Sequence, residues 1–161
     1  MSMNIVFNID QILQMSERIE ENNVRFYEQA AEKVETAENK AFLEKMASFE
    51  KEHESCFSSM RKELSTEEKE QTTFDPEDQS MQYCQSHADL QKLLNYDVDF
   101  SDYEEVLKAA IQHEKDAILF YVGMKDFVPA RLGLDKIEDI IHEEMSHINI
   151  LSRELKKLKE L

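Results

Sequence analysis

Two stretches of this chain repeat the same pattern of residues 94 positions apart, and this repeat limits how the chain can fold. In each stretch, a glutamate on an otherwise apolar helical stripe is followed 30 residues later by a Glu-x-x-His motif. The first copy consists of Glu20, Glu50 and His53, and the second of Glu114, Glu144 and His147. One Glu-x-x-His motif is a weak signal in a glutamate-rich chain, but two copies with matched spacing are a strong one.

Long amphipathic helices are the expected setting for both copies. The sequence has only two glycines and two prolines, and apolar residues recur at helical spacing around each motif. Helices are predicted over residues 10–34, 37–64, 101–127 and 130–160. The third starts with a capping box at Ser101 and Glu104, and the fourth starts near Pro129 or near Asp135, where Asp135 and Glu138 form a second cap-like pair. Short connections make each successive pair an antiparallel hairpin, and residues 65–100 form a long crossover, with a short helix in its second half. We therefore expect an all-α, antiparallel four-helix bundle in a single domain over residues 1–161.

The two motifs also indicate a metal site. Side chains at positions i and i+3 of a helix are neighbours, so each Glu-x-x-His pair can reach one ion. Four buried glutamates are costly unless their charge is balanced, and two divalent cations together with neutral histidines balance it. Carboxylate and imidazole ligands suit iron or manganese, whereas structural zinc usually recruits cysteine. The alternative is a set of buried Glu–His hydrogen bonds without metal.

The four helices and the paired motifs resemble the rubrerythrin-like branch of the ferritin-like di-iron carboxylate superfamily. The resemblance implies a ferritin-like bundle with two iron ions in its core, with manganese or mixed metals as alternatives. It implies that Glu50 and Glu144 bridge the ions, that Glu20 and Glu114 are terminal ligands, and that His53 and His147 complete the set. In such proteins a tyrosine near the position of Tyr27 or Tyr121 hydrogen-bonds a ligand carboxylate. The alternative for both tyrosines is a purely apolar packing role.

The same resemblance implies an oxidoreductase that reduces peroxide or dioxygen. Two alternatives remain, a ferroxidase or iron-handling protein and a bundle whose metals are purely structural. Some rubrerythrins carry a rubredoxin module, whose iron is bound by four cysteines. This chain has only Cys56 and Cys84. Electrons would therefore come from a separate donor, such as a rubredoxin-type protein. In addition, Ala117 stands where these rubrerythrins carry an extra glutamate ligand.

Composition narrows the setting and the partners. The net charge of −16 argues against a nucleic-acid or anionic-membrane partner, since both favour a basic surface. No apolar run reaches the length of a membrane span, and the N-terminus lacks the pattern of a secretory signal, so a cytoplasmic location is expected. A homodimer is an open alternative. Three histidines are expected at the surface or at an interface: His87, His113 and His142. Three phenylalanines are expected in the core or at the interface of a dimer: Phe26, Phe49 and Phe120.

Overall fold

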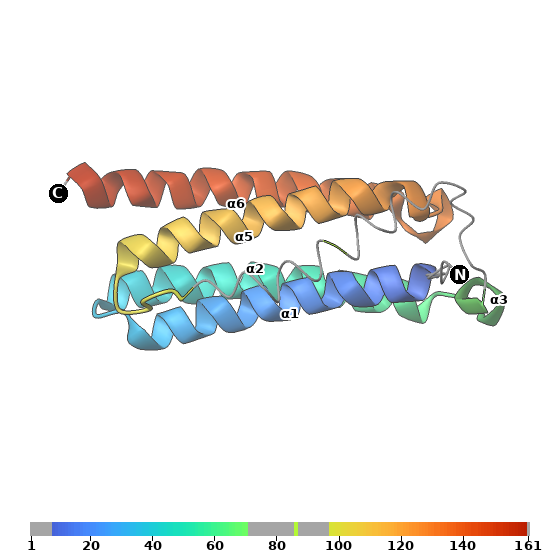
Figure 1. Ribbon diagram of the computed structural model, residues 1–161, viewed down its shortest axis with the longest axis horizontal. Coiled ribbons are helices and arrows are strands. Elements are labelled where there is room, and N and C mark those ends of the chain that lie inside the picture. The colour runs from blue at the N-terminus through green and yellow to red at the C-terminus, as the bar shows by residue number, and fades with distance from the viewer. Residues whose placement is uncertain (1–7, 71–85, 87–96, 161) are drawn as a thin grey trace.

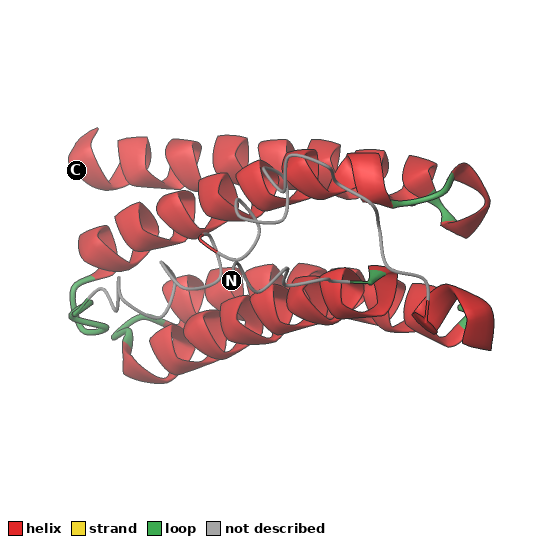
Figure 2. Cartoon of the chain, turned by 45° about the vertical axis from the view of Figure 1, so that its right-hand side comes forward, coloured by secondary structure: helices red, strands yellow, loops and turns green. Residues whose placement is uncertain are grey.

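The computed structural model describes residues 8–70, 86 and 97–160 of the chain. Over these residues it contains helices and no strands, and its four long α-helices run alongside one another (Figure 1). Helix α1 (Ile9–Lys33) packs mainly against α2 (Ala37–Lys62), and α5 (Tyr103–Met124) mainly against α6 (Leu134–Glu160). The second view shows the same two hairpins facing each other (Figure 2). The prediction of an all-α bundle built from two helical hairpins is confirmed.

Side-chain caps explain where the first two helices start. The carboxamide oxygen of Asn8 accepts the backbone N–H of Gln11 at 2.9 Å, and the Gln11 side chain accepts the N–H of Asn8 at 3.0 Å. The hydroxyl of Thr36 accepts the N–H of Asn39 at 3.1 Å at the start of α2. Each contact satisfies an N–H group that has no partner within the helix. The predicted helix starts at residues 10 and 37 are therefore close to the observed ones.

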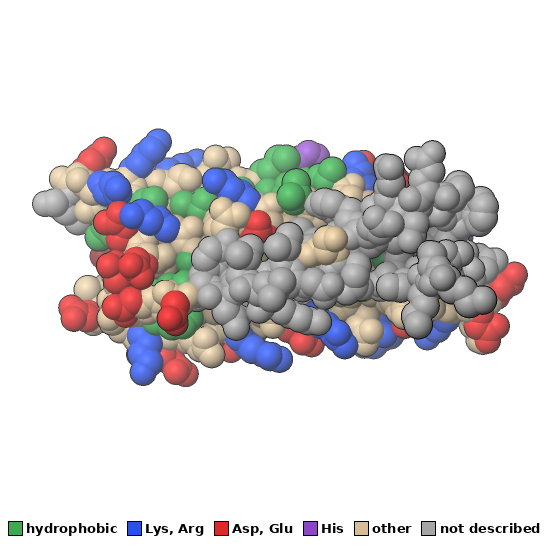
Figure 3. Space-filling model, viewed as in Figure 1, with side chains coloured by type: hydrophobic (Ala, Val, Ile, Leu, Met, Phe, Trp, Pro, Cys, Tyr) green, Lys and Arg blue, Asp and Glu red, His purple; other side chains and the backbone are tan. Residues whose placement is uncertain are grey.

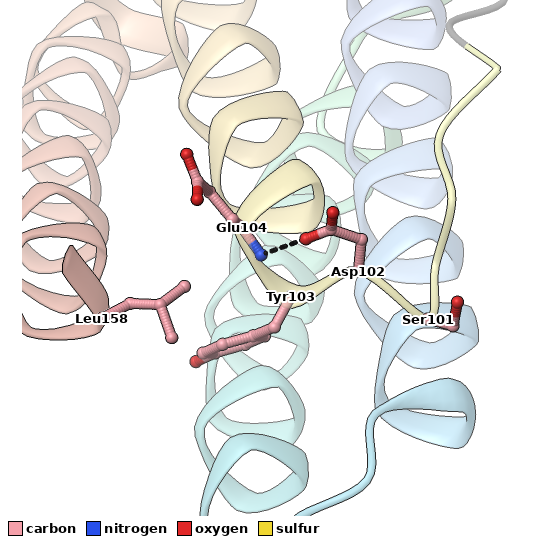
Figure 4. Close-up of a pocket in the computed structure, with 5 residues that line it drawn as sticks. All are labelled: Ser101, Asp102, Tyr103, Glu104 and Leu158. Atoms are coloured by element: carbon pink, nitrogen blue, oxygen red, sulfur yellow. Dashed lines mark hydrogen bonds between the residues drawn. The ribbon is translucent and has the colours of Figure 1, made fainter. Parts of the chain in front are cut away.

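Helix α5 starts two residues later than predicted, and its cap is a different residue. The carboxylate of Asp102 accepts the N–H groups of Glu104 at 2.9 Å and Glu105 at 3.2 Å, and Figure 4 shows the first of these bonds. The hydroxyl of Ser101 instead donates to Asp99 at 2.6 Å. A carboxylate also interacts favourably with the positive end of the helix dipole, which favours Asp102 over Ser101. The capping box predicted for Ser101 and Glu104 is wrong.

The connection between α5 and α6 is less regular than the predicted helices over 101–127 and 130–160. Two short 3-10 turns, η1 (Lys125–Phe127) and η2 (Ala130–Leu132), lie between the α-helices. Gly133 follows with φ of 104°, a left-handed conformation that other residues rarely adopt. Helix α6 therefore begins at Leu134, next to the predicted start near Asp135, and the alternative start near Pro129 is wrong.

The crossover between the hairpins is described only in part. It contains the short helix α3 (Thr66–Glu70) directly after α2. Of the short helix predicted in its second half, residue 86 is described and is helical, and the rest lies outside the described residues, as do Cys84 and His87.

Two apolar clusters fill the bundle, one toward each end. Their most buried members are drawn from all four long helices: Phe57, Phe120, Tyr121 and Ile137 in the first cluster, and Tyr27, Leu43, Leu107 and Leu151 in the second. Along every helix, the residues of the Glu/His repeat lie between the stretches that contribute to these two clusters. The repeat therefore falls at the middle of the bundle, with apolar packing on both sides.

The surface carries charges of both signs over its described part, as Figure 3 shows for one face. Three large apolar side chains are exposed among them: Leu119, Val122 and Met145. No helix within the described residues is long and apolar enough to cross a membrane. A homodimer remains an open alternative.

We expect Phe57→Ala to destabilise the metal-free protein by about 3–5 kcal/mol. Phe57 is fully buried, and its ring lies 5.1 Å from that of Tyr121, so truncation leaves a cavity beside the site. Urea unfolding followed by circular dichroism measures the change. Val122→Ala is the control, because Val122 is 52% exposed and its truncation should change stability by no more than about 0.5 kcal/mol. Equal effects of the two substitutions would contradict the described core.

Candidate metal centre

The fold brings all six residues of the sequence repeat together at the middle of the bundle. The four glutamate side chains are fully buried, and the two histidines are nearly so. They form two groups in which one potential ligand atom per residue lies within 4.8 Å of the others: Glu20, Glu50, His53 and Glu144, and Glu50, Glu114, Glu144 and His147. The two groups share Glu50 and Glu144, the residues expected to bridge two ions.

Glu144 lies between the two histidines. Its Oε1 is 3.1 Å from Nδ1 of His53, and its Oε2 is 2.8 Å from Nδ1 of His147. The two imidazole rings stack with their centroids 5.5 Å apart. Nδ1 of His147 also lies 3.2 Å from Glu50 and 3.6 Å from Glu114. Both histidines therefore direct Nδ1 into the carboxylate cluster.

Two tyrosines hydrogen-bond the outer glutamates across the bundle. The hydroxyl of Tyr27 on α1 donates to Oε1 of Glu114 on α5 at 2.5 Å, and that of Tyr121 on α5 donates to Oε1 of Glu20 on α1. Burial raises the pKa of both phenols well above the ordinary value, and the neighbouring carboxylates add to this, so both remain donors. Each tyrosine is thus both a core aromatic and a partner of a site carboxylate, and neither bonds the glutamate of its own helix.

The same cluster joins the two halves of the molecule. Each hairpin packs mainly within itself, α1 on α2 and α5 on α6. Several polar contacts at the centre instead cross between the hairpins, since Tyr27 donates to Glu114 and His53 contacts Glu144. A substitution in the cluster therefore affects both the site and the docking of the hairpins, and metal binding has to be measured together with folding.

Two further residues at the site were not found from the sequence. The amide of Asn23 donates to Oε2 of Glu50 at 3.4 Å, and Oε2 of Glu143 lies 2.7 Å from Nε2 of His53. Asn23 could have been found as a buried polar residue one turn after Glu20 on an apolar stripe. Glu143 gives no such signal, because its exposed side chain resembles the other surface glutamates of α6.

The electrostatics of the cluster favour bound protons when no cation is present. Burial is the main cause that raises the pKa of Glu20 and of Glu114 well above the ordinary value, and neighbouring carboxylates add to it. Burial alone would lower the pKa of His53 and His147, but hydrogen bonds to glutamates outweigh it and raise both. Burial would raise the pKa of Glu144, but the hydrogen bonds from the two histidines outweigh it and lower that pKa. Protons therefore offset part of the buried negative charge.

The residues present fit a pair of divalent cations. Three carboxylate oxygens in the cluster are buried without a hydrogen-bond partner: Oε2 of Glu20, Oε1 of Glu50 and Oε2 of Glu114. A buried carboxylate oxygen without a partner is costly, and a cation would satisfy it. Four glutamates balance the charge of two divalent ions, and carboxylate with imidazole suits iron or manganese. The buried Glu/His cluster therefore fits a dinuclear metal site.

The remaining sequence predictions near the site have mixed outcomes. His142 is exposed, as expected. His113 is only half-buried rather than a surface residue, because its ring packs edge-on against Phe26 with centroids 4.5 Å apart. Phe26 and Phe120 are buried in the core. Phe49 is half-buried and stacks on the ring of His147.

Comparisons with known proteins support the fold. No protein-family model matches the sequence, and no curated protein matches it significantly. A solved structure from Thermotoga maritima, described as a candidate ferritin-like diiron-carboxylate protein, superimposes with a TM-score of 0.69. The two sequences are 23% identical, and the match covers 94% of this chain and 96% of that one. The bundle therefore has the ferritin-like fold that the resemblance implied.

We expect the metal-free protein to lose stability as the pH rises above the ordinary pKa values of glutamate and histidine, 4.5 and 6.5. In this range the folded state binds more protons than the unfolded state, because the pKa values of Glu20, Glu114, His53 and His147 are raised on folding. The free energy of unfolding then falls with increasing pH. Thermal unfolding of chelator-treated protein at several pH values measures the slope.

Glu20→Gln should reduce this slope, because an amide does not titrate. Glu32→Gln, which changes an exposed glutamate on the same helix, should leave it unchanged. If both variants change the pH dependence of stability equally, the effect comes from surface charge and not from the buried cluster.

Proposed function

We propose that this chain is a rubrerythrin-like, non-haem di-iron oxidoreductase that reduces peroxide or dioxygen. The observation that carries the proposal is the pair of buried Glu/His groups that share Glu50 and Glu144. The ferritin-like fold and the description of the Thermotoga maritima protein as a diiron-carboxylate protein support iron as the metal. Manganese or a mixed pair is the alternative.

In this proposal the six residues of the repeat are the metal ligands. Glu20 and His53 serve one ion, Glu114 and His147 serve the other, and Glu50 and Glu144 serve both. The proposed terminal ligands, Glu20 and Glu114, are the two glutamates that the tyrosines hold. Each terminal carboxylate has one oxygen fixed by a phenol and one without a hydrogen-bond partner. Such an arrangement orients the second oxygen toward the centre of the cluster.

The surrounding residues suit redox chemistry in a dry site. Two ferrous ions, when bound, would supply two electrons, which together with two protons reduce one peroxide to two waters. The apolar clusters on both sides exclude bulk water from the carboxylates. Electrons for further turnovers would come from a separate donor protein, such as a rubredoxin-type protein, because the two cysteines of this sequence are too few for the four-cysteine iron of a rubredoxin module.

A ferroxidase is the second candidate, and Ala117 favours it. Ala117 is fully buried at the position where rubrerythrins with a rubredoxin module have an additional glutamate ligand. An alanine there supplies no ligand, which weakens the case for their peroxide chemistry. The two candidates differ in what happens after the iron is oxidised. A ferroxidase releases or passes on ferric iron and accepts more ferrous iron, whereas a peroxidase is re-reduced in place.

We expect Fe(II) or Mn(II) to stabilise the folded protein by about 2.7 kcal/mol at a free metal concentration of 100 times the dissociation constant. Thermal unfolding under anaerobic conditions measures the rise in Tm. Glu50→Ala and Glu144→Ala should lose most of the rise, because each removes a residue shared by both groups. Glu52→Ala, which changes an exposed glutamate on the same helix as Glu50, is the control and should keep it. An equal rise in all four proteins would place the metal elsewhere.

We expect the ferrous protein to be oxidised by hydrogen peroxide in a single turnover, with one peroxide consumed per two irons. Stopped-flow absorbance and a peroxide assay measure the reaction. Glu114→Ala should abolish it without loss of the helical circular-dichroism signal, whereas Glu52→Ala should leave it intact. If an added electron donor re-reduces the oxidised protein without loss of iron, the result would support the peroxidase. If the oxidised protein takes up further Fe(II) without a donor, the result would support the ferroxidase. If neither peroxide nor dioxygen oxidises the ferrous protein, both enzyme candidates would be wrong, and a purely structural metal site would be the remaining alternative.

A further inference from the structure

The repeat makes the two halves of the site alike, but the two halves differ at a pair of positions whose side chains lie against the histidines. Residue 143 corresponds to residue 49 through the shift of 94, and these residues are Glu143 and Phe49. Each lies against the histidine of the opposite hairpin: Glu143 against His53, and Phe49 against His147. The two histidines of the repeat therefore have chemically different supports.

Glu143 contacts the outer nitrogen of His53. Its Oε2 lies 2.7 Å from Nε2, while Nδ1 of the same ring lies 3.1 Å from Glu144 inside the cluster. When Nε2 keeps its proton and donates it to Glu143, the neutral ring has its lone pair on Nδ1. A carboxylate that accepts from the outer N–H of a histidine also fixes the ring and raises the basicity of the inner nitrogen. Glu143 thus prepares His53 to bind a cation through Nδ1.

His147 has no equivalent support among the described residues. The ring of Phe49 stacks on it with centroids 5.1 Å apart and an angle of 19° between the planes. The ammonium of Lys45 lies 5.7 Å from the centre of the Phe49 ring, which places a positive charge on this side. A stacked phenyl ring restricts the orientation of the imidazole, but it neither selects a tautomer nor accepts its N–H. The repeat pairs Lys45 with Asp139, so the charge difference between the two sides extends one turn further.

We infer that Glu143 is a positioning residue for His53 and that it makes the two metal positions unequal. The group that contains Glu20 and His53 binds the first cation more tightly, and the group that contains Glu114 and His147 binds the second. Glu143 acts through His53 and belongs to neither ligand group. The inference rests on the proposed function, namely that the cluster binds two divalent cations.

Titration of the metal-free, full-length protein with Co(II) tests this inference, because Co(II) reports its ligands in its visible absorption. Calorimetry and absorption should show two Co(II) ions bound in two separate steps. His53→Ala should remove the tighter step, and His147→Ala the weaker one. These two variants assign each step to one side of the site.

Glu143→Ala should weaken the tighter step by about 10–100-fold, the usual effect of removing the carboxylate behind a metal-binding histidine. Glu143→Gln should weaken it less, because the amide oxygen still accepts the N–H but has no charge. Asp139→Asn is the matched control: Asp139 is exposed one turn earlier on α6, and its loss of charge should change the tighter step by less than about twofold. In a His53→Ala background, Glu143→Ala should have no further effect on the remaining step.

The outcomes separate this inference from the proposed function. Two Co(II) ions bound by wild type, with both steps unchanged in Glu143→Ala or weakened equally, would overturn the role of Glu143 and leave the dinuclear site standing. Failure of wild type to bind Co(II) at the cluster would overturn both. Circular dichroism and thermal unfolding of metal-free Glu143→Ala and Glu143→Gln should match wild type, since Glu143 is 60% exposed. A large loss of metal-free stability would identify Glu143 as a structural residue and would contradict the inference.

Discussion

The burial of four carboxylates at the centre of one bundle is the constraint on which the rest of this structure depends. Isolated buried carboxylates are strongly disfavoured, so every neighbouring group has to reduce their cost. The phenols donate to the outer pair, the histidines contact Glu144, and Asn23 donates to Glu50. Three carboxylate oxygens still lack a hydrogen-bond partner. In a polar network without a cation, these buried oxygens would be expected to have hydrogen-bond partners. Their lack of such partners favours a cation-binding site.

The near-symmetry of the repeat sets the basic arrangement, and the departures from it introduce differences. Glutamate, histidine and tyrosine occur at matched positions in both halves, and their contacts are reciprocal. Asn23 is paired with Ala117, and Glu143 with Phe49. A pair of equivalent ions would need neither difference. The inference that the two positions bind cations with different affinities rests on the second of these differences.

The sequence by itself determined the helices and the six central residues, because both are expressed in local spacing. Apolar periodicity marks a buried helical face, and a glutamate or histidine on that face is conspicuous wherever the helix packs. Helix ends were less certain, because Asp102 and Ser101 are both good caps and the choice depends on contacts with Asp99. Two starts are compatible with the sequence of the last helix, one near Pro129 and one near Asp135. Gly133, with a φ of 104°, places the observed start at Leu134, next to the second of these.

Only the tertiary structure decided which residues meet across the bundle. Tyr27 and Glu114 are far apart in the chain, and no spacing rule predicts that each tyrosine bonds the glutamate of the other hairpin rather than its own. Glu143 is an exposed glutamate among many, and it reaches His53 only because α6 lies beside α2 at that level. Local periodicity specifies which face of a helix is buried. The packing of one hairpin on the other determines which side chain that face contacts.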